Sequence, residues 1–289
     1  MIAPLACPRC RAALAELRCR QCGREYDVVD EVPILLADVT PAAEQQAAFF
    51  DHVVDDEFEI ERPAGTPAFF RWLLEEKFRR AVAGTPVRGR SVLVVCGGSG
   101  MDAEFLVRAG ARVASSDISL GAARRTLERA RRHDVSMAAL VADAEHLPFE
   151  DRSVDIAYVH DGLHHLERPL AALEEMARVA SIAVCVTEPA RATATAIAAR
   201  FGLAKNVEEA GNRVERVEID ELRETLERHG FQIVNADRYA MVYRHEPGPL
   251  MRALSLRFTF AFAKAGFRLV NAVMGRGGNK AVVVGVRVG

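Results

Sequence analysis

The sequence has no long apolar run and no marked excess of either charge. Its 289 residues carry a formal net charge of −2, so no whole-molecule field would attract nucleic acid or an anionic membrane. No stretch approaches the roughly 18 apolar residues that a membrane-spanning helix needs. The opening MIAPLACPRC also lacks the basic region and apolar stretch of a secretory signal. We therefore expect a cytoplasmic protein.

Cysteine is scarce and unevenly placed. Four of the six cysteines fall in the motifs CPRC and CRQC near the start of the chain. In a chain with no export signal, such pairs favour a metal site over disulfide bonds. Two Cys-x-x-Cys turns supply the four thiolates of one tetrahedral Zn²⁺ and leave no open position for water, which indicates a structural role. The predicted zinc ligands are Cys7, Cys10, Cys19 and Cys22.

From residue 91 onward, short apolar runs alternate with amphipathic segments. The runs are 91–96, 111–117, 137–143, 154–160 and 182–188, and the amphipathic segments are 101–109, 121–133 and 169–179. Continuous apolar strands joined by helices indicate an α/β fold with a parallel sheet covered on both faces. After a helix at 219–229, two further runs at 231–243 and 279–288 are expected to pair as an antiparallel finish to the sheet.

The first expected strand runs into the loop CGGSGMD, which a helix follows. Glycines let the backbone turn tightly and approach a ligand, and the helix N-terminus offers unpaired N–H groups. Asp117 ends the second strand, where a carboxylate can accept bonds from both ribose hydroxyls. Asp143 ends the third, where it would meet an adenine amino group. The loop has no full G-x-G-x-x-G and no Walker lysine, so a pyrophosphate would fit poorly.

Together these segments resemble class I S-adenosylmethionine-dependent methyltransferases. The resemblance rests on VLVVCGGSG, SSDIS, VADAEHLPFEDRSVDIAYVHDGLHHL and the EP at 188–189, and it spans 91–289. It implies a Rossmann-like sheet of seven strands with helices on both faces, and S-adenosylmethionine (SAM) as cofactor. The residues that it implies for the cofactor site are Cys96, Gly97, Gly98, Gly100, Asp117, Ile118, Asp143, Ala144 and His160. A dinucleotide-binding Rossmann domain is the alternative.

The chain departs from this family at two positions. Val94 stands where the family usually has an acidic residue within the first strand, and Cys96 replaces the first loop glycine. Main-chain carbonyls of Cys96 and His160 would then take over the contact with the cofactor's amino group.

The cysteine-rich segment CPRCRAALAELRCRQCGREYDVVDEVPILL resembles the small zinc ribbons that precede some methyltransferase domains, for example in guanine-N1 rRNA methyltransferases. That family usually has histidine as its last ligand, where this chain has Cys22, so the resemblance implies the ribbon fold rather than an RNA substrate. We expect a zinc ribbon at 1–37, a linker and helices covering the cofactor site at 38–90, and the methyltransferase domain at 91–289. One helix is expected at 68–83, and the acidic run at 55–61 is expected to be a solvated face.

The nonapeptide YVHDGLHHL at 158–166 ends the fourth expected strand. In the resembling family, a leucine followed by two histidines is common in enzymes that bind no metal, whereas residues like His160 and Asp161 are less usual. One interpretation is therefore that His164 and His165 cap the strand-to-helix turn and line the pocket wall. An imidazole, with a pKa of about 6.5, can take the proton of a substrate hydroxyl. We predict His160 or His164 as the base and Asp161 as the residue that orients it. Alternatively, Asp161, a histidine and Glu188 would hold Mg²⁺ against sugar hydroxyls.

Residues 246–278 are expected to form a cap inserted between the last two strands. The stretch from Gly248 to Gly278 contains no acidic residue, and two short amphipathic helices joined near 255–259 are predicted. It would be a packed cap with a basic edge, a surface for a hydrophobic substrate or lipid, a homodimer contact, or an RNA-facing patch. Residues 207–220 would form a loop over the substrate. The side chains expected to point into the pocket are Tyr239, Tyr243, Arg244 and His245.

The leading interpretation is a SAM-dependent methyltransferase that acts at an oxygen atom of a small molecule or glycan. Near-neutral charge, the histidine cluster and the apolar cap favour it. Methylation of nucleic-acid bases would favour an Asn-Pro-Pro-Tyr-like motif or a paired catalytic cysteine, and the sequence has neither. The alternatives are an RNA methyltransferase that uses the zinc ribbon for binding, and a non-catalytic SAM- or partner-binding subunit.

Overall fold

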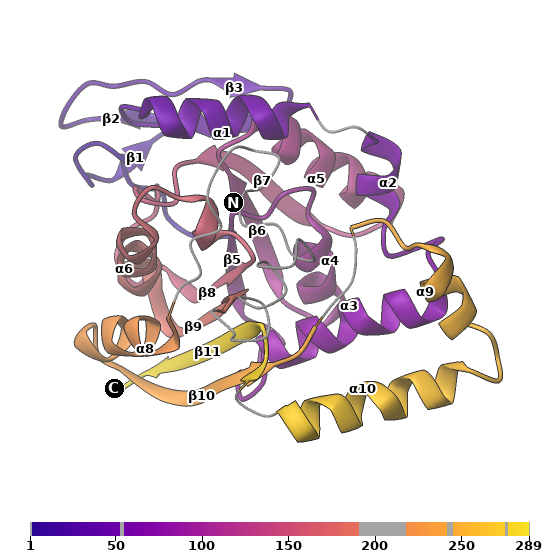
Figure 1. Ribbon diagram of the computed structural model, residues 1–289. Helices are drawn as coiled ribbons and strands as arrows, with labels where there is room; N and C mark the ends of the chain where they lie inside the picture. The colour runs from indigo at the N-terminus through magenta and orange to yellow at the C-terminus, as the bar shows by residue number, and fades with distance from the viewer. Residues whose placement is uncertain (1, 53–54, 191–217, 242–244, 275–276, 289) are drawn as a thin grey trace.

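A nine-stranded sheet forms the centre of the fold in the computed structural model, which describes residues 2–52, 55–190, 218–241, 245–274 and 277–288 (Figure 1). Its strands are β3 (Val28–Val29), β4 (Val32–Leu35), β5 (Ser91–Val95), β6 (Arg112–Asp117), β7 (Met137–Ala142), β8 (Val154–His160), β9 (Ala180–Pro189), β10 (Phe231–Tyr239) and β11 (Lys280–Arg287). The spatial order is β10-β11-β9-β8-β5-β6-β7-β4-β3.

The strand directions confirm the predicted fold class. From β4 to β9 every neighbouring pair is parallel. β11 lies between β9 and β10 and is antiparallel to both. The buried runs of β5 to β9 are apolar on both faces because helices cover both faces of the sheet.

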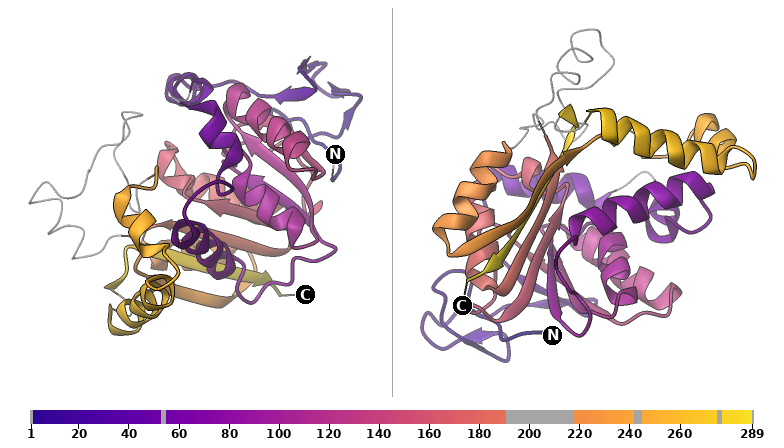
Figure 2. Two further views of the ribbon diagram at one scale, coloured as in Figure 1. Left: turned by 90° about the vertical axis from the view of Figure 1, so that its right-hand side faces the viewer. Right: turned by 90° about the horizontal axis from the view of Figure 1, so that it is seen from below.

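Helices pack on the two faces of the sheet as expected, α6 and α8 on one and α3, α4 and α5 on the other (Figure 2). The helices are α1 (Pro41–Asp51), α2 (Asp56–Glu61), α3 (Ala68–Ala81), α4 (Met101–Arg108), α5 (Leu120–Arg132), η1 (Leu163–His165), α6 (Pro169–Val179), α8 (Ile219–Arg228), α9 (Pro249–Leu254) and α10 (Phe260–Met274). No described helix has both the length and the apolar character that crossing a bilayer requires.

The number of strands in the sheet differs from the expected seven. β4 pairs with β7, aligning Ile34 with Val141 and Leu35 with Ala142, and β3 pairs with β4. Both additional strands come from the segment expected to be a separate ribbon. An unpaired β7 would be an exposed sheet edge, and β4 covers it with backbone hydrogen bonds.

The rest of the cysteine-rich segment also packs on the main core. β1 (Leu14–Ala15) and β2 (Arg18–Cys19) form a small sheet of their own. Cys7, Cys19 and Tyr26 nevertheless belong to the same buried cluster as Met176 of α6, and the backbone N–H of Ala6 donates to the carbonyl of Pro148. The segment therefore shares the core of the parallel sheet.

Within the expected linker, residues 41–51 form α1 and residues 56–61 form α2, and two arginines of α5 hold them in place. Arg125 donates to the Phe50 carbonyl at 2.6 Å, and the fully buried Arg129 donates to the carbonyls of Arg62 and Glu59. The expected solvated acidic face is wrong at Glu59, which is buried and pairs with Arg62 at 2.9 Å. The helix expected at 68–83 is α3.

The predicted cap forms two helices, α9 and α10, with the join where it was expected. α10 lies alongside α3 (Figures 1 and 2). Tyr239 is buried, and His245 contacts Glu59 of α2 at 2.5 Å. Tyr243, Arg244 and most of the loop expected at 207–220 lie outside the described residues.

Candidate active site

The loop between β5 and α4 packs closely on its neighbours and is open at one glycine. A Cβ atom on Gly97 would lie 2.0 Å from Ser115 Oγ, and one on Gly100, where φ is +80°, would lie 2.9 Å from Thr126 Oγ1. A Cβ on Gly98 would meet no atom within 4 Å. The loop therefore leaves open space beside the Cα of Gly98, just before the N-terminus of α4, where a ligand could approach the backbone closely.

The two aspartates expected to face the cofactor end neighbouring parallel strands, and loops fix both. Asp117 Oδ2 accepts a bond from the Gly98 N–H at 2.9 Å, and burial raises the pKa of this carboxyl. Asp143 Oδ1 accepts from the N–H of Glu145, and Oδ2 lies 3.0 Å from His146 Nδ1. The other two expected residues, Ile118 and Ala144, follow them directly. These four residues therefore lie at the carboxyl ends of two neighbouring parallel strands.

The two departures from the resembling family have a structural setting. Val94 is buried in the core of β5. Cys96 takes a left-handed conformation, with φ of 53°, and a Cβ on Gly162 would lie 2.4 Å from its own Cβ. Burial raises the pKa of the Cys96 thiol well above its usual range. The side chain is therefore an uncharged packing group between the ends of β5 and β8, not a nucleophile.

His160 ends β8 with one ring nitrogen held and the other without a hydrogen bond. Its Nδ1 lies 3.3 Å from Asp102 Oδ2 and 3.2 Å from the Tyr158 hydroxyl, which itself donates to Asp102. Nε2 is buried and has no hydrogen-bond partner among the described residues. Burial raises the pKa of Asp102, but the neighbouring His160 outweighs this and lowers it. An ionised Asp102 favours the tautomer with hydrogen on Nδ1, which leaves the Nε2 lone pair available.

Asp161 adjoins this histidine, but its closest partners are two lysines. Lys77 of α3 lies 2.9 Å from Oδ2, and Lys280 of β11 lies 2.5 Å from Oδ1, whereas His160 Nε2 is 3.8 Å away. Burial raises the pKa of Asp161, but Lys280 and Lys77 outweigh it and hold the pKa well below its usual range. The carboxylate that contacts His160 Nδ1 is therefore that of Asp102, whereas Asp161 pairs with the two lysines.

His164 lies in the turn η1 and contacts the buried Glu188. Its Nδ1 is 2.7 Å from Glu188 Oε2, while Oε1 accepts bonds from the N–H groups of Gly162 and Leu163. His165 packs edge-on against Phe50 at 5.4 Å. These contacts fix the strand-to-helix turn, as the pocket-wall interpretation requires.

The described residues do not bring Asp161, Glu188 and a histidine together as the magnesium site would need. Within the described residues, the only group of three or more converging metal-ligand side chains is a set of four cysteines. Asp161 is occupied by two ammonium groups, which would repel a divalent cation, and Glu188 is committed to the η1 turn.

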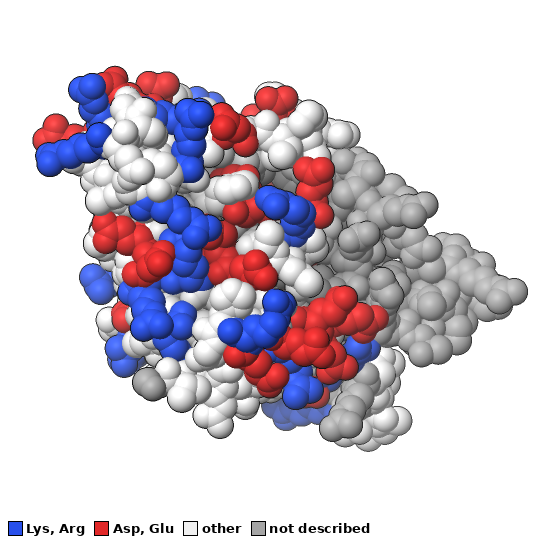
Figure 3. Space-filling model, turned by 90° about the vertical axis from the view of Figure 1, so that its left-hand side faces the viewer, with Lys and Arg blue, Asp and Glu red and all other residues white. Residues whose placement is uncertain are grey.

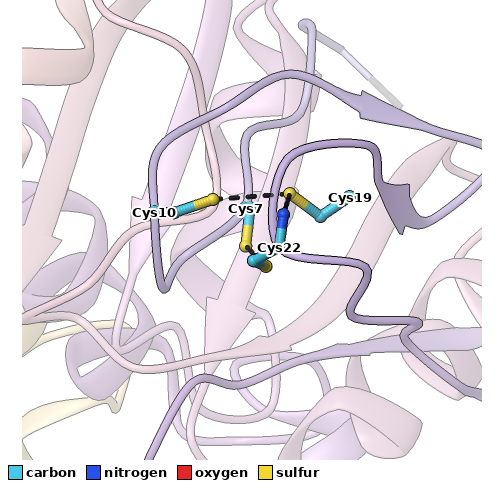
Figure 4. A group of neighbouring side chains, drawn as sticks. All are labelled: Cys7, Cys10, Cys19 and Cys22. Carbon is cyan, nitrogen blue, oxygen red and sulfur yellow. Dashed lines mark hydrogen bonds between the residues drawn. The ribbon is translucent and has the colours of Figure 1, made fainter.

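The four cysteines lie together in the N-terminal segment (Figure 4). All four sulfur atoms lie within 4.8 Å of one another, with Cys7 to Cys22 at 3.7 Å and Cys10 to Cys19 at 3.4 Å. Tetrahedral Zn–S bonds of about 2.3 Å would separate the sulfur atoms by about 3.8 Å. The cluster therefore fits a zinc ribbon.

Elsewhere, a polar cavity of about 570 Å³ lies beside α6 and the cysteine-rich segment. Arg11 and Arg178 pair with Glu175, and Arg168 pairs with Glu145, at distances of 2.7–2.9 Å. The side of α6 and α8 accordingly shows interleaved basic and acidic atoms (Figure 3). This side offers no uniformly basic surface for RNA.

Comparison with known families matches residues 93–182 to the one described as "Methyltransferase domain". This segment is a methyltransferase domain. A demethylmenaquinone methyltransferase of Paenarthrobacter aurescens is 38% identical over 91 residues, covering 32% of this chain and 34% of the relative. The chain thus spans about a third of the length of that curated relative.

Solved structures with the same fold extend the likeness beyond this methyltransferase domain. Magnesium protoporphyrin IX methyltransferase from Synechocystis PCC 6803 with bound SAH is 15% identical, with a TM-score of 0.58, and covers 86% of this chain and 100% of its own. A chain from the complex between the Haloferax volcanii Trm112 methyltransferase activator and a methyltransferase is 20% identical, with a TM-score of 0.51. The match covers 76% of this chain and 96% of that chain. At these identities the likeness shows the fold alone.

Four residues near His160 and Asp161 were not identified from the sequence: Lys77, Asp102, Tyr158 and Lys280. Tyr158 lies two residues before His160, so strand alternation places both on one face of β8. That periodicity could have identified Tyr158. The contacts of the other three depend on the packing of α3, α4 and β11 and leave no local pattern.

Proposed function

We propose that the chain is a SAM-dependent methyltransferase that methylates a hydroxyl group of a small molecule or glycan, with His160 as the base. One observation carries this proposal: His160 Nε2 is buried without a hydrogen-bond partner in the described chain, while Nδ1 faces Asp102 at 3.3 Å. A base must be held in one orientation with its lone pair available, and this histidine meets both conditions.

The cofactor would supply an activated methyl group, so positioning and proton removal are the chief tasks of the protein. The backbone at Gly98, with Asp117 and Asp143, would hold the cofactor at the edge of the parallel strands. Nε2 of His160 would accept the hydroxyl proton, and Asp102 would stabilise the resulting imidazolium. His164 would act on the shape of the pocket by fixing η1 through Glu188, so it is a positioning residue.

The names of the relatives make reduced demethylmenaquinone the first acceptor to test against hydroxyl methylation, because its methylation would take place at a ring carbon rather than at an oxygen. Those relatives are matched over about a third of their length, so a wider panel of phenols, lipid-soluble hydroxyl compounds and glycans should accompany it. Transfer of labelled methyl groups from SAM to each acceptor would identify the class.

The test of the base is the substitution His160→Ala in the full chain. We expect kcat to fall about 10²–10⁴-fold while the affinity for SAM, measured by calorimetry, is retained. His229→Ala is the matched control, because His229 caps α8 and its ring contacts the Thr225 carbonyl of that helix, and it should leave kcat unchanged. A kcat within a fewfold of wild type in His160→Ala would contradict the assignment.

We also propose that the four cysteines bind Zn²⁺ as a structural ion, on the strength of their mutual distances. The boundaries 1–37, 38–90 and 91–289 stay proposals, since the first segment shares the core of the third.

Two alternatives have direct tests. RNA binding that weakens steeply with salt would favour an RNA methyltransferase, and absence of SAM binding would favour a partner-binding subunit.

A further inference from the structure

We propose that the outer face of α9 and α10 docks on the surface of an anionic lipid bilayer. The described residues include twelve exposed large hydrophobic side chains, and eight of them lie between residues 250 and 274. These eight, here named the apolar face, are Leu250, Leu256, Phe258, Phe262, Leu269, Val270, Val273 and Met274. Such a concentration on one segment marks an interaction surface rather than scattered surface apolar groups.

The opposite side of α10 holds the helix in one orientation. The Phe267 ring lies edge-on to Trp72 of α3 at 5.2 Å, and the ammonium of Lys264 lies 5.7 Å from the same indole. The Asn271 side chain accepts from the N–H of Ala240 at 2.8 Å and donates to its carbonyl. Because these contacts fix the inner side, the apolar face cannot turn inward without breaking them.

Exposure is greatest for the large side chains of the apolar face. Phe258 is 84% exposed, Phe262 79% and Val273 78%. On the outer side of α10 the only charged side chain that is exposed is Arg268. A helix with this distribution suits the boundary between headgroups and acyl chains, where apolar side chains enter the bilayer.

The charges around the apolar face identify the kind of partner. From residue 247 to 274 the chain has Arg252, Arg257, Lys264 and Arg268 and no acidic residue. Arginines can extend their charged ends to anionic headgroups while their stems stay with apolar groups. The overall charge of −2 does not oppose this, because at physiological salt only charges within about 8 Å act strongly.

A second copy of the chain and an RNA fit the same surface less well. In a two-fold dimer the patch would meet itself and bring arginines of both copies together without acidic partners. An RNA would use the arginines but would leave Phe258 and Phe262 in water. The bilayer uses both features.

The docking surface packs on a helix that contributes to the candidate active site. α10 packs on α3, and α3 carries Lys77, which contacts Asp161. The docking itself does not depend on the proposed methyl transfer and can be tested without any acceptor.

The experiment is co-sedimentation of the full chain with vesicles of phosphatidylcholine alone or with one quarter phosphatidylglycerol. We expect roughly tenfold or greater preference for the anionic vesicles. Phe258→Ser with Phe262→Ser should reduce the partition coefficient at least about tenfold, and Arg257→Gln with Arg268→Gln should abolish the preference for anionic lipid. Val28→Ser with Val234→Ser, which changes exposed valines elsewhere, should bind as wild type does.

Melting temperatures of all variants would verify that each is folded. Absence of wild-type binding to either kind of vesicle would overturn the proposal, as would equal binding by the double serine variant. Sedimentation that shows a dimer lost in the serine variant, without vesicle binding, would assign the face to a second copy. RNA binding lost in the arginine variant, without vesicle binding, would assign it to nucleic acid.

Discussion

Two lysines far apart in the sequence converge on one carboxylate beside the candidate base. The chain contains four lysines, and Lys77 and Lys280 both contact Asp161. His160 and Asp161 could be singled out as candidates from the sequence because they are adjacent at a strand end. The lysines could not be found in this way, since their contact exists only after α3 packs beside β11. The same reasoning explains why Asp102 was missed as the partner of His160.

Lys280→Met is expected to lower the free energy of unfolding at pH 7 by about 2 kcal/mol. The figure is below that for a fully buried pair because the Asp161 side chain is a quarter exposed, at 25%. The lowered pKa of Asp161 means that its ionised form stabilises the fold. That contribution is complete above the ordinary aspartate pKa of about 3.9 and is lost as pH falls through the lower folded-state value.

The difference between wild type and Lys280→Met in urea unfolding should therefore be constant from pH 7 to about pH 4 and narrow below it. Lys264→Met is the control, because Lys264 lies over Trp72 and Phe260 and has no part in the Asp161 pair. Equal stability of wild type and Lys280→Met at pH 7 would show that the ion pair does not stabilise the fold.

Among the elements, the regular strands and the antiparallel pair of β10 and β11 were predictable, and the pairing of β4 with β7 was not. Five buried apolar runs each followed or preceded a helical pattern, so β5 to β9 could be located from periodicity alone. The run VPILL was assigned to an independent ribbon, and β4 instead extends the sheet beyond β7. Pairing of an edge strand depends on which segment lies nearest in space. Here the pairing consists of two aligned residues of β4, Ile34 and Leu35.

Removal of zinc should destabilise the whole fold rather than melt one end of it. Cys7 and Cys19 are fully buried in the core cluster that includes Met176, and the same segment supplies β4. We expect one zinc ion per chain by metal analysis. Loss of it, through a chelator or Cys22→Ser, should lower the melting temperature of the single transition and increase hydrogen exchange in β7.

Cys185→Ala is the matched control for the zinc experiment. Cys185 lies mid-strand in β9 and outside the cluster, so this variant should keep one zinc ion per chain. An unchanged melting temperature after complete loss of zinc would contradict a structural role for the ion.

At the scale of the whole molecule, the cysteine-rich segment and the methyltransferase domain share one buried core, so we expect them to unfold together. Leu5 bridges to Phe149, Arg11 pairs with Glu175 at 2.9 Å, and β4 hydrogen-bonds to β7. The sequence suggested a boundary near residue 37 because composition and motif change there. A change of motif does not reveal whether two segments share a core, since that depends on contacts between distant residues.

Deletion of residues 1–37 tests this unity directly. Without the segment, the β7 edge would offer unpaired N–H and C=O groups, and the buried Leu147 and Phe149 would be exposed to water. Such edges promote association between chains. We expect residues 38–289 to aggregate or to unfold at a markedly lower temperature than the full chain, as judged by light scattering and circular dichroism. A soluble, monomeric truncation with the melting temperature of the full chain would instead establish the segment as a separate domain.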